Sequence, residues 1–249
     1  MSASAGPDPS RGLYETVLIA DGDPVALRPH LDRLADSARE LFGAELPAAL
    51  ADDAARAGQG QELGRMRIAV EPVSGGGLRH AIRVTAVDPR EFFADWEHGE
   101  ALRSVRATGW AGAHKWSDRR WLEEAEARLG TEVPLLVGAD GTVLEAGRAN
   151  LFVVEDGALA TPPADGRILA GTARAATLEI AAELGIAAAE RPLRLDDLRA
   201  ADEVFLTSSV RGLRPARYLD GEELRRGELV DRLAAELRRR WLGGASGPS

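Results

Sequence analysis

Lys115 is the one lysine among 31 basic residues, since all the others are arginines. Arginine and lysine serve a solvated surface about equally well, but only the primary amine of lysine can lose its proton and form a Schiff base. Two explanations stand: the lysine persists by chance, or it performs chemistry that a guanidinium cannot. Lys115 lies in GAHKWSDRR ahead of a predicted helix, and the positive end of a helix dipole would lower the pKa of its amine. We therefore treat Lys115 as a candidate nucleophile and base.

Glu145 and Asn150 lie in VLEAGRANLFVV, at the point where one predicted strand ends and another begins. An ordinary strand, loop and strand would account for both residues. Alternatively, Glu145 projects from the strand end into a cleft. A carboxylate in that place could keep a ring nitrogen protonated, which an electron-accepting cofactor requires.

Two short polar segments could bind a phosphate. Gly171-Thr172-Ala173 precedes a predicted helix, whose first backbone N–H groups and hydroxyl would form an anion cradle. Thr207-Ser208-Ser209 follows the apolar strand VFL and could add hydroxyls to that cradle. By itself, each segment is also what any capped helix or polar strand end contains. Together with Lys115 and Glu145, they make up the set of groups that pyridoxal phosphate needs.

The composition disfavours several other kinds of site. The chain has 249 residues, 40 of them acidic, and a formal charge of −9, so a broad nucleic-acid-binding surface is not expected. It has no cysteine, which excludes disulfides and thiolate chemistry. No metal site is expected, because the histidines are scattered: His30, His80, His98 and His114. No apolar run approaches the roughly 20 residues of a membrane span and no signal peptide is visible, so we expect a cytoplasmic protein.

The elements that must position these residues fall into two groups. In the first, hydrophobic periodicity predicts a strand over 13–20, helices over 27–42 and 46–62, and paired strands over 65–70 and 78–86. Residues 88–113 are less periodic and are predicted to connect two domains. The second group is predicted to contain a helix over 117–129 capped by Ser117, hairpins over 134–145 and 151–159, a helix over 172–184, a strand over 203–207 and a helix over 229–241. We expect a disordered tail over 1–12, a small domain over 13–108 and a larger one over 109–249.

The order of these motifs resembles that of the class IV aminotransferases, the fold-type IV pyridoxal-phosphate enzymes, over about residues 13–220. YET followed by HLDRLADSA is similar to the family's opening strand and helix, which implies that Arg33 binds the cofactor phosphate. HKWSDRR is similar to the segment of the Schiff-base lysine, here Lys115. LEAGRANLF is similar to the family's most specific motif, which implies that Glu145 faces the pyridine nitrogen and that Asn150 belongs to the cofactor site.

The resemblance also covers both phosphate loops. ILAGTARAATLE is similar to the family's second phosphate loop, which implies that the backbone of Gly171, Thr172 and Ala173 contacts the phosphate. DEVFLTSSVRGLRP is similar to the last loop, which implies phosphate-binding roles for Ser208 and Ser209. The implied fold is α/β (α+β), with a small N-terminal α/β domain and a larger C-terminal domain that contains a mixed β pseudo-barrel. A homodimer is also implied.

Within the family, the K-W-S-D-R pattern looks most like 4-amino-4-deoxychorismate lyase, which eliminates pyruvate and leaves 4-aminobenzoate for folate synthesis. The resemblance thus implies a small-molecule substrate supplied by an aminodeoxychorismate synthase. The alternative is an aminotransferase acting on branched-chain or D-amino acids, because both reactions share their first half. A third alternative is a binding module that has kept the fold and lost the activity.

Substrate contacts are less defined by the motifs. The lyase substrate carries two carboxylates, which suit arginine, so Arg211 and Arg119 are candidates for binding them. The resemblance adds Thr16, in the YET segment. Two residues depart from the family: Leu18 stands where many members have an arginine, and Ala173 replaces a frequent threonine but keeps its backbone N–H.

Overall fold

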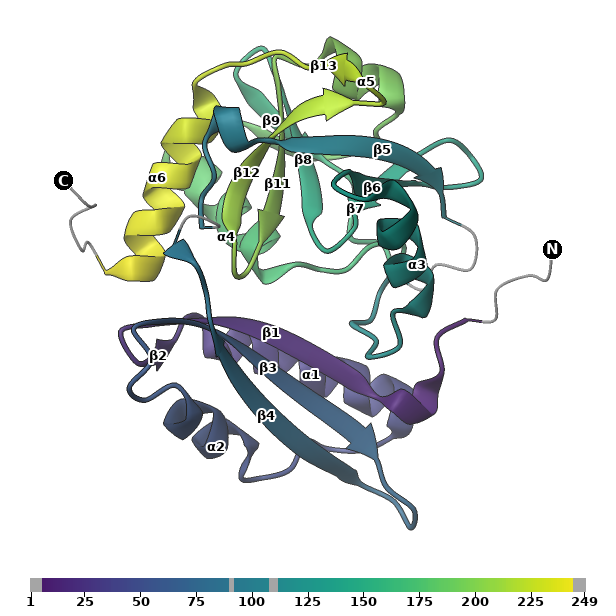
Figure 1. Ribbon diagram of the computed structural model, residues 1–249, viewed down its shortest axis with the longest axis vertical. Helices are drawn as coiled ribbons and strands as arrows, with labels where there is room; N and C mark the ends of the chain where they lie inside the picture. Colours follow the sequence, from purple (N-terminus) through teal and green to yellow (C-terminus); the bar gives the residue numbers. More distant parts are fainter. Residues whose placement is uncertain (1–5, 90–91, 108–111, 244–249) are drawn as a thin grey trace. The chain divides into compact units, whose positions relative to one another are not determined.

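The computed structural model describes residues 6–89, 92–107 and 112–243 (Figure 1). The chain forms two compact units, and each is described by itself. The small unit comprises Pro7–Phe92 and His114–Arg119, and the large unit comprises Met1–Gly6, Phe93–Ala113 and Arg120–Ser249. The expected boundary at residues 108 and 109 lies outside the described residues, and the division in the structure falls between Phe92 and Phe93.

The small unit is a four-stranded antiparallel sheet of order β2-β1-β3-β4 with two helices. Its elements are η1 (Pro9–Arg11), β1 (Leu13–Ala20), β2 (Asp23–Pro24), α1 (Leu27–Phe42), α2 (Leu50–Ala57), β3 (Leu63–Pro72) and β4 (Leu78–Ala86). Alternate residues of the strands, such as Val17 and Ile68, pack against Leu34 of α1 and Leu50 of α2. The apolar face of the strands, which repeats every two residues, therefore packs against the apolar face of α1, which repeats every 3.6 residues.

The segment around Lys115 belongs to the small unit. The backbone N–H of Tyr14 donates to the carbonyl of Lys115 at 2.9 Å, and that of Ser117 donates to Gly12 at 2.9 Å. Gly12 has a φ of +71°, and a Cβ there would lie 1.9 Å from the carbonyl oxygen of Val70 on β3. The expected assignment of Lys115 to a domain over 109–249 is therefore corrected, because these bonds join it to β1.

The expectation of a disordered tail over 1–12 is wrong for the last residues of that segment. Residues 1–5 lie outside the described part of the chain, but Pro9–Arg11 form a turn of 3-10 helix. The N–H of Asp8 donates to the carboxylate of Asp118 at 2.9 Å, and the Asp8 side chain accepts from the N–H of Ser10. These bonds order the segment that leads into β1.

The large unit contains a nine-stranded mixed sheet of order β10-β9-β8-β11-β12-β5-β6-β7, with β13 paired to β12. Its strands are β5 (Glu100–Arg106), β6 (Val133–Val137), β7 (Val143–Ala146), β8 (Asn150–Glu155), β9 (Ala158–Thr161), β10 (Ala188–Glu190), β11 (Glu203–Ser208), β12 (Gly212–Leu219) and β13 (Glu222–Glu223). Its helices are η3 (Trp96–His98), α3 (Arg120–Leu129), α4 (Thr172–Glu183), α5 (Leu195–Ala200) and α6 (Leu229–Leu242).

This sheet curls back on itself, since Ala146 of β7 forms a bridge to Ala149, the residue before β8. The inner layer contains Leu102, Leu151 and Leu206 from three of its strands. A second apolar layer lies between the sheet and helices α4 and α6 (Figure 1), and it contains Phe152 and Phe205. The expected two-part fold with a mixed β pseudo-barrel is confirmed by this arrangement.

Several predicted elements have different bounds in the structure. The helix predicted over 46–62 covers only Leu50–Ala57, because it starts after Pro47 and stops at Gly58. The helix expected to be capped by Ser117 begins at Arg120. The segment 88–113 contains β5, a strand inside the sheet that sequence periodicity missed. Its sequence, EALRSVR, lacks a strict alternation of apolar and polar residues, and its two partners, β12 and β6, are distant in sequence.

We expect Phe205→Ala to destabilise the protein by about 3–5 kcal/mol, because it opens a cavity in the second apolar layer. Phe205 is fully buried and stacks on Phe152 with ring centroids 5.1 Å apart. The matched variant Phe205→Leu keeps most of the side-chain volume and should lower the free energy of unfolding by less than about 1.5 kcal/mol. Urea unfolding of both variants measures the difference, and equal losses would contradict this account of the packing.

Candidate active site

In the small unit, Lys115 lies beside Tyr14 of β1. The Nζ atom is 5.0 Å from the centroid of the Tyr14 ring. The guanidinium carbon of Arg67 lies 3.8 Å from the same centroid, and Arg119 donates a hydrogen bond to the Tyr14 hydroxyl. The amine of Lys115 and two guanidinium groups thus lie around one buried aromatic ring, and the Arg67 guanidinium is attracted to its π face. Arg119, a candidate for substrate binding, is therefore held near the candidate amine.

The environment of Lys115 lowers the pKa of its amine. Burial is the main cause, and the charges of Arg33 and Arg119 act in the same direction, while Tyr14 and Glu15 oppose them. The lowering agrees with the expectation from the sequence, and burial of the amine is its main cause. A lowered pKa increases the share of neutral amine, which is the form that attacks a carbonyl or accepts a proton.

Arg33 of α1 is held by a buried carboxylate. Its Nε donates to Glu15 Oε1 at 2.8 Å and its Nη2 to Glu15 Oε2 at 2.6 Å. His30, one turn earlier on α1, bonds Glu15 Oε2 through Nδ1 at 2.8 Å. Burial by itself would raise the pKa of Glu15, but the Arg33 charge and the bonds from both partners lower it to about 2. The carboxylate is therefore ionised and fully engaged.

The remaining small-unit residues named from the sequence lie on β1. Thr16 is half-buried, and its register partner on β3 is Arg67. Because side chains alternate along a strand, Thr16 is on the same face as Tyr14. Leu18 shares that face and is fully buried, so an apolar residue occupies the position where an arginine was expected from the family.

In the large unit, Glu145 is a buried carboxylate on β7, one residue before that strand ends. Its Oε2 accepts from the Asn150 side-chain amide at 3.2 Å and from the Leu169 backbone N–H at 3.3 Å. The same amide group of Asn150 also donates to the Leu169 carbonyl at 2.9 Å. Asn150 thus contacts Glu145 directly and orients its carboxylate.

The first turn of α4 lies against Asn150. A Cβ added at Gly171 would come within 1.9 Å of Asn150 Oδ1, so only glycine fits there. Gly171 is the N-cap of α4 and provides no side-chain cap. Thr172 is the first helical residue and half-buried, whereas Ala173 is buried. The sequence-predicted cradle is therefore brought next to the Glu145 group.

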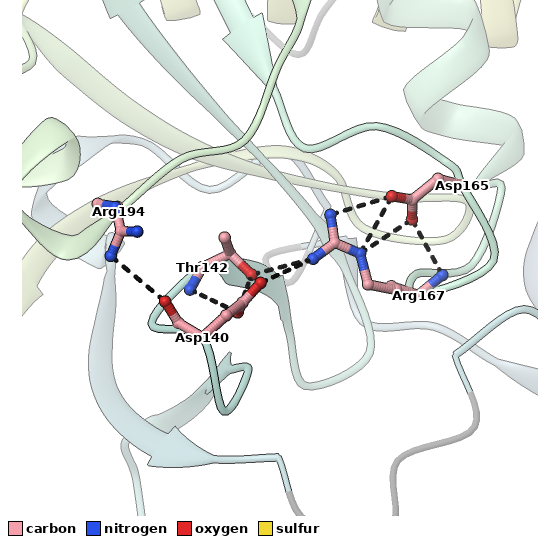
Figure 2. Close-up of polar contacts among 5 residues, drawn as sticks. All are labelled: Asp140, Thr142, Asp165, Arg167 and Arg194. Carbon is pink, nitrogen blue, oxygen red and sulfur yellow. Dashed lines mark hydrogen bonds and ion pairs between the residues drawn. The ribbon is translucent and has the colours of Figure 1, made fainter.

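The loop that carries Leu169 is tied to the β6–β7 hairpin (Figure 2). Arg167 donates to Asp140 Oδ2 at 3.3 Å and to the Thr142 hydroxyl at 3.2 Å, and its Nε donates to Asp165. Asp140 in turn accepts from the Thr142 N–H, and its carbonyl accepts from Arg194. These contacts anchor the loop on one side, while Asn150 holds it on the other.

The β11–β12 turn carries the last group of predicted residues. Ser208 and Ser209 are half-buried, and the Ser208 hydroxyl accepts from the Arg211 N–H at 3.2 Å. Arg211 is exposed. Thr207 is 2% exposed, and within residues 6–89, 92–107 and 112–243 its hydroxyl has no hydrogen-bond partner. Thr207 pairs in register with Asn150, so this unsatisfied hydroxyl belongs to the same end of the sheet.

The residues present fit pyridoxal phosphate in their chemistry. Lys115 supplies an amine with a lowered pKa, and Glu145 supplies a buried carboxylate that accepts hydrogen bonds. Gly171 leaves the start of α4 without a side-chain cap, and Thr207 offers a buried hydroxyl in need of a partner. An unsatisfied buried hydroxyl is uncommon in folded proteins, so its presence favours a ligand with acceptor oxygens.

Sequence reasoning assigned no role to three of these participants: Tyr14, Glu15 and His30. One of them was detectable, because His30 and Arg33 are three residues apart on a predicted helix and so share a face. Glu15 stood inside the YET motif, but no spacing shows that a strand residue will meet a particular arginine. Among the described residues, no group of three or more potential metal ligands occurs, and no helix is long and apolar enough to cross a membrane.

Comparison with known proteins agrees with this chemistry. The model of the amino-transferase class IV family matches residues 12–219, so the chain belongs to this family. The chain is 29% identical over 252 residues to a bifunctional aminodeoxychorismate lyase / D-amino acid transaminase of Mycobacterium tuberculosis, covering 88% of this chain and 86% of that protein. The crystal structure of a 4-amino-4-deoxychorismate lyase from Pseudomonas aeruginosa superimposes with a TM-score of 0.79 at 27% identity, covering 96% of this chain and 95% of that one.

A branched-chain-amino-acid aminotransferase of Escherichia coli (strain K12) is 36% identical over 100 residues. That match spans 40% of this chain and only 32% of the length of the E. coli protein. The match to the family model confirms the family expected from the sequence. Because this family consists of pyridoxal-phosphate enzymes, it also confirms the expected cofactor.

Acid should destabilise the protein through the Glu15 group. The pKa of His30 is lowered by burial from 6.5, so the unfolded chain binds that proton first as the pH falls, and stability declines below about pH 6.5. The Glu15 pKa is lowered from 4.5 to about 2, so its contribution of about 3 kcal/mol is complete above pH 4.5 and lost as the pH falls towards 2. Urea unfolding at decreasing pH measures both losses. Glu15→Gln should remove the second, and an unchanged pH profile in that variant would contradict the assignment.

Proposed function

We propose that this protein is a pyridoxal-phosphate-dependent 4-amino-4-deoxychorismate lyase, which releases pyruvate and 4-aminobenzoate. The observation that carries the chemistry is the chain's one side-chain amine, Lys115, buried among groups that lower its pKa. The choice of lyase is supported by the K-W-S-D-R pattern and by similarity, over most of the chain, to a protein named for this activity.

Each residue has a defined task in this proposal. Lys115 would hold the cofactor through its amine, and Arg33 together with the starts of the two phosphate loops would hold the phosphate. Glu145, oriented by Asn150, would accept a hydrogen bond from the protonated ring nitrogen. When bound, pyridoxal phosphate withdraws electrons from the carbon next to the substrate amine.

Lys115 then acts as the base at that carbon. With the cofactor bound, the neutral amine of Lys115 would take the C4 proton of the substrate. Pyruvate leaves from C3, and formation of the aromatic ring drives the reaction. The substrate carries two carboxylates, and we propose Arg211 as the residue that binds one of them. Arg119, whose guanidinium lies beside the Tyr14 ring, and Thr16 are the other proposed substrate contacts.

An aminotransferase is the second candidate function. The M. tuberculosis relative is named for a D-amino acid transaminase activity as well as for the lyase, and the E. coli relative for branched-chain amino acids. Both activities need the same cofactor residues and the same first proton transfer. They differ in the step that follows: the lyase reaction would break the bond from C3 to the departing pyruvate, whereas transamination would return the proton to the cofactor carbon and leave a keto acid.

The proposed setting follows from the chemistry. We propose that the protein acts as a cytoplasmic homodimer on a small molecule delivered by an aminodeoxychorismate synthase. A nucleic-acid partner is not proposed, because the chain carries a net charge of −9.

Product analysis tests the proposed function. The pure protein with pyridoxal phosphate should convert aminodeoxychorismate to pyruvate and 4-aminobenzoate. Lys115→Ala and Lys115→Arg should lower this rate by more than about a thousandfold, since neither offers an amine that can act as nucleophile and base. Amino-group exchange with L- or D-amino acids and no 4-aminobenzoate would replace the lyase with the aminotransferase. A borohydride-stable cofactor adduct on a Lys115 variant would refute the role of Lys115.

Arg211→Ala should raise KM for aminodeoxychorismate about ten- to a hundredfold, because a hydrogen bond between charged groups is lost. Arg128→Ala on the exposed side of α3 is the matched control and should change KM little. Steady-state kinetics measures both. If Arg211→Ala left KM and kcat unchanged, Arg211 would not be a substrate ligand.

A further inference from the structure

Two consecutive residues of β1 contact the two groups proposed to hold the cofactor in the small unit. The Tyr14 ring lies beside the amine of Lys115, and the Glu15 carboxylate binds the guanidinium of Arg33. Neighbouring side chains on a strand point to opposite faces. One strand therefore sets the positions of the amine and the guanidinium at the same time.

The Glu15 carboxylate is engaged on both oxygens. Oε1 accepts from Arg33 Nε at 2.8 Å, and Oε2 accepts from Arg33 Nη2 at 2.6 Å and bonds His30 Nδ1 at 2.8 Å. The side chains of Glu15, His30 and Arg33 are 1%, 2% and 13% exposed. A bidentate pair fixes the plane of a guanidinium as well as its distance, which a single bond cannot do.

This polar group stands in an apolar layer. Its neighbours on the same faces of β1 and α1 are Leu13, Val17 and Leu34, all fully or almost fully buried. Replacing a buried ion pair with apolar residues of similar volume is often neutral or stabilising. A core function alone therefore gives little reason for three polar side chains at this place, and the orientation of Arg33 gives one.

We propose that Glu15, supported by His30, is a positioning residue that presents Arg33 to the phosphate of the cofactor. This inference rests on the proposed function, because it takes Arg33 as the phosphate-binding arginine. Glu15 itself does not touch the cofactor. It acts through Arg33, while the adjacent Tyr14 sets Lys115 from the other face of β1.

Two ligands that differ only in the phosphate test this inference. Dissociation constants of pyridoxal phosphate and of pyridoxal are measured by absorbance on the full-length protein freed of cofactor, for the wild type, Glu15→Gln, Arg33→Met and the double variant. We expect Glu15→Gln to weaken the binding of pyridoxal phosphate about tenfold and to leave the binding of pyridoxal unchanged, because only the orientation of Arg33 toward the phosphate is lost. The double variant should bind pyridoxal phosphate no more weakly than Arg33→Met.

Several outcomes would overturn the proposal. Equal weakening of both ligands by Glu15→Gln would indicate a general structural role, and additive losses in the double variant would show that Glu15 does not act through Arg33. Unchanged or tighter binding of pyridoxal phosphate would show that orientation of Arg33 contributes nothing. If Glu15→Gln does not fold, His30→Gln carries the test, with a smaller loss confined to the phosphate ligand expected and an equal loss for both ligands refuting it. A wild type that binds neither ligand would instead refute the proposed function.

Discussion

The backbone hydrogen bond from Tyr14 to Lys115 is the contact on which the small unit's part of the site depends. Lys115 is remote from β1 in the sequence, and this bond, together with that from Ser117 to Gly12, brings it beside the strand. Because Lys115 is paired to β1, the amine comes under the influence of Tyr14, Glu15 and the arginines nearby. The lowered pKa of the amine is thus a result of strand pairing and burial.

In the large unit, the comparable constraint is the hydrogen-bonded group around Glu145. Asn150 joins the carboxylate to the loop before α4, and its side chain leaves room only for glycine at Gly171. The orientation of the carboxylate and the start of the helix are therefore set by the same side chain. The contacts of Arg167 with Asp140 and Thr142 hold the outer part of that loop.

The two activities considered for this protein share this machinery. The amine, the carboxylate and the phosphate cradle serve any reaction that begins with loss of a proton next to the substrate nitrogen. We propose that the placement of the substrate carboxylates, by arginines such as Arg211, separates a lyase from an aminotransferase. The arginine content of the chain supplies many such cations, of which Arg67 and Arg119 lie against Tyr14.

The sequence by itself determined the chemical inventory of the protein and most of its elements. Lys115 was identified by its rarity, Glu145 and the phosphate loops by their motifs, and strands and helices such as 13–20 and 27–42 by their periodicity, which is a local property of the chain. Only the tertiary structure decided which residues meet. Strand β5, the membership of Lys115 in the small unit and the Glu15–Arg33 pair all depend on pairing between distant segments. Periodicity shows which face of a segment is apolar but not which distant segment it will contact, because the free energy of that contact arises only when both segments are folded.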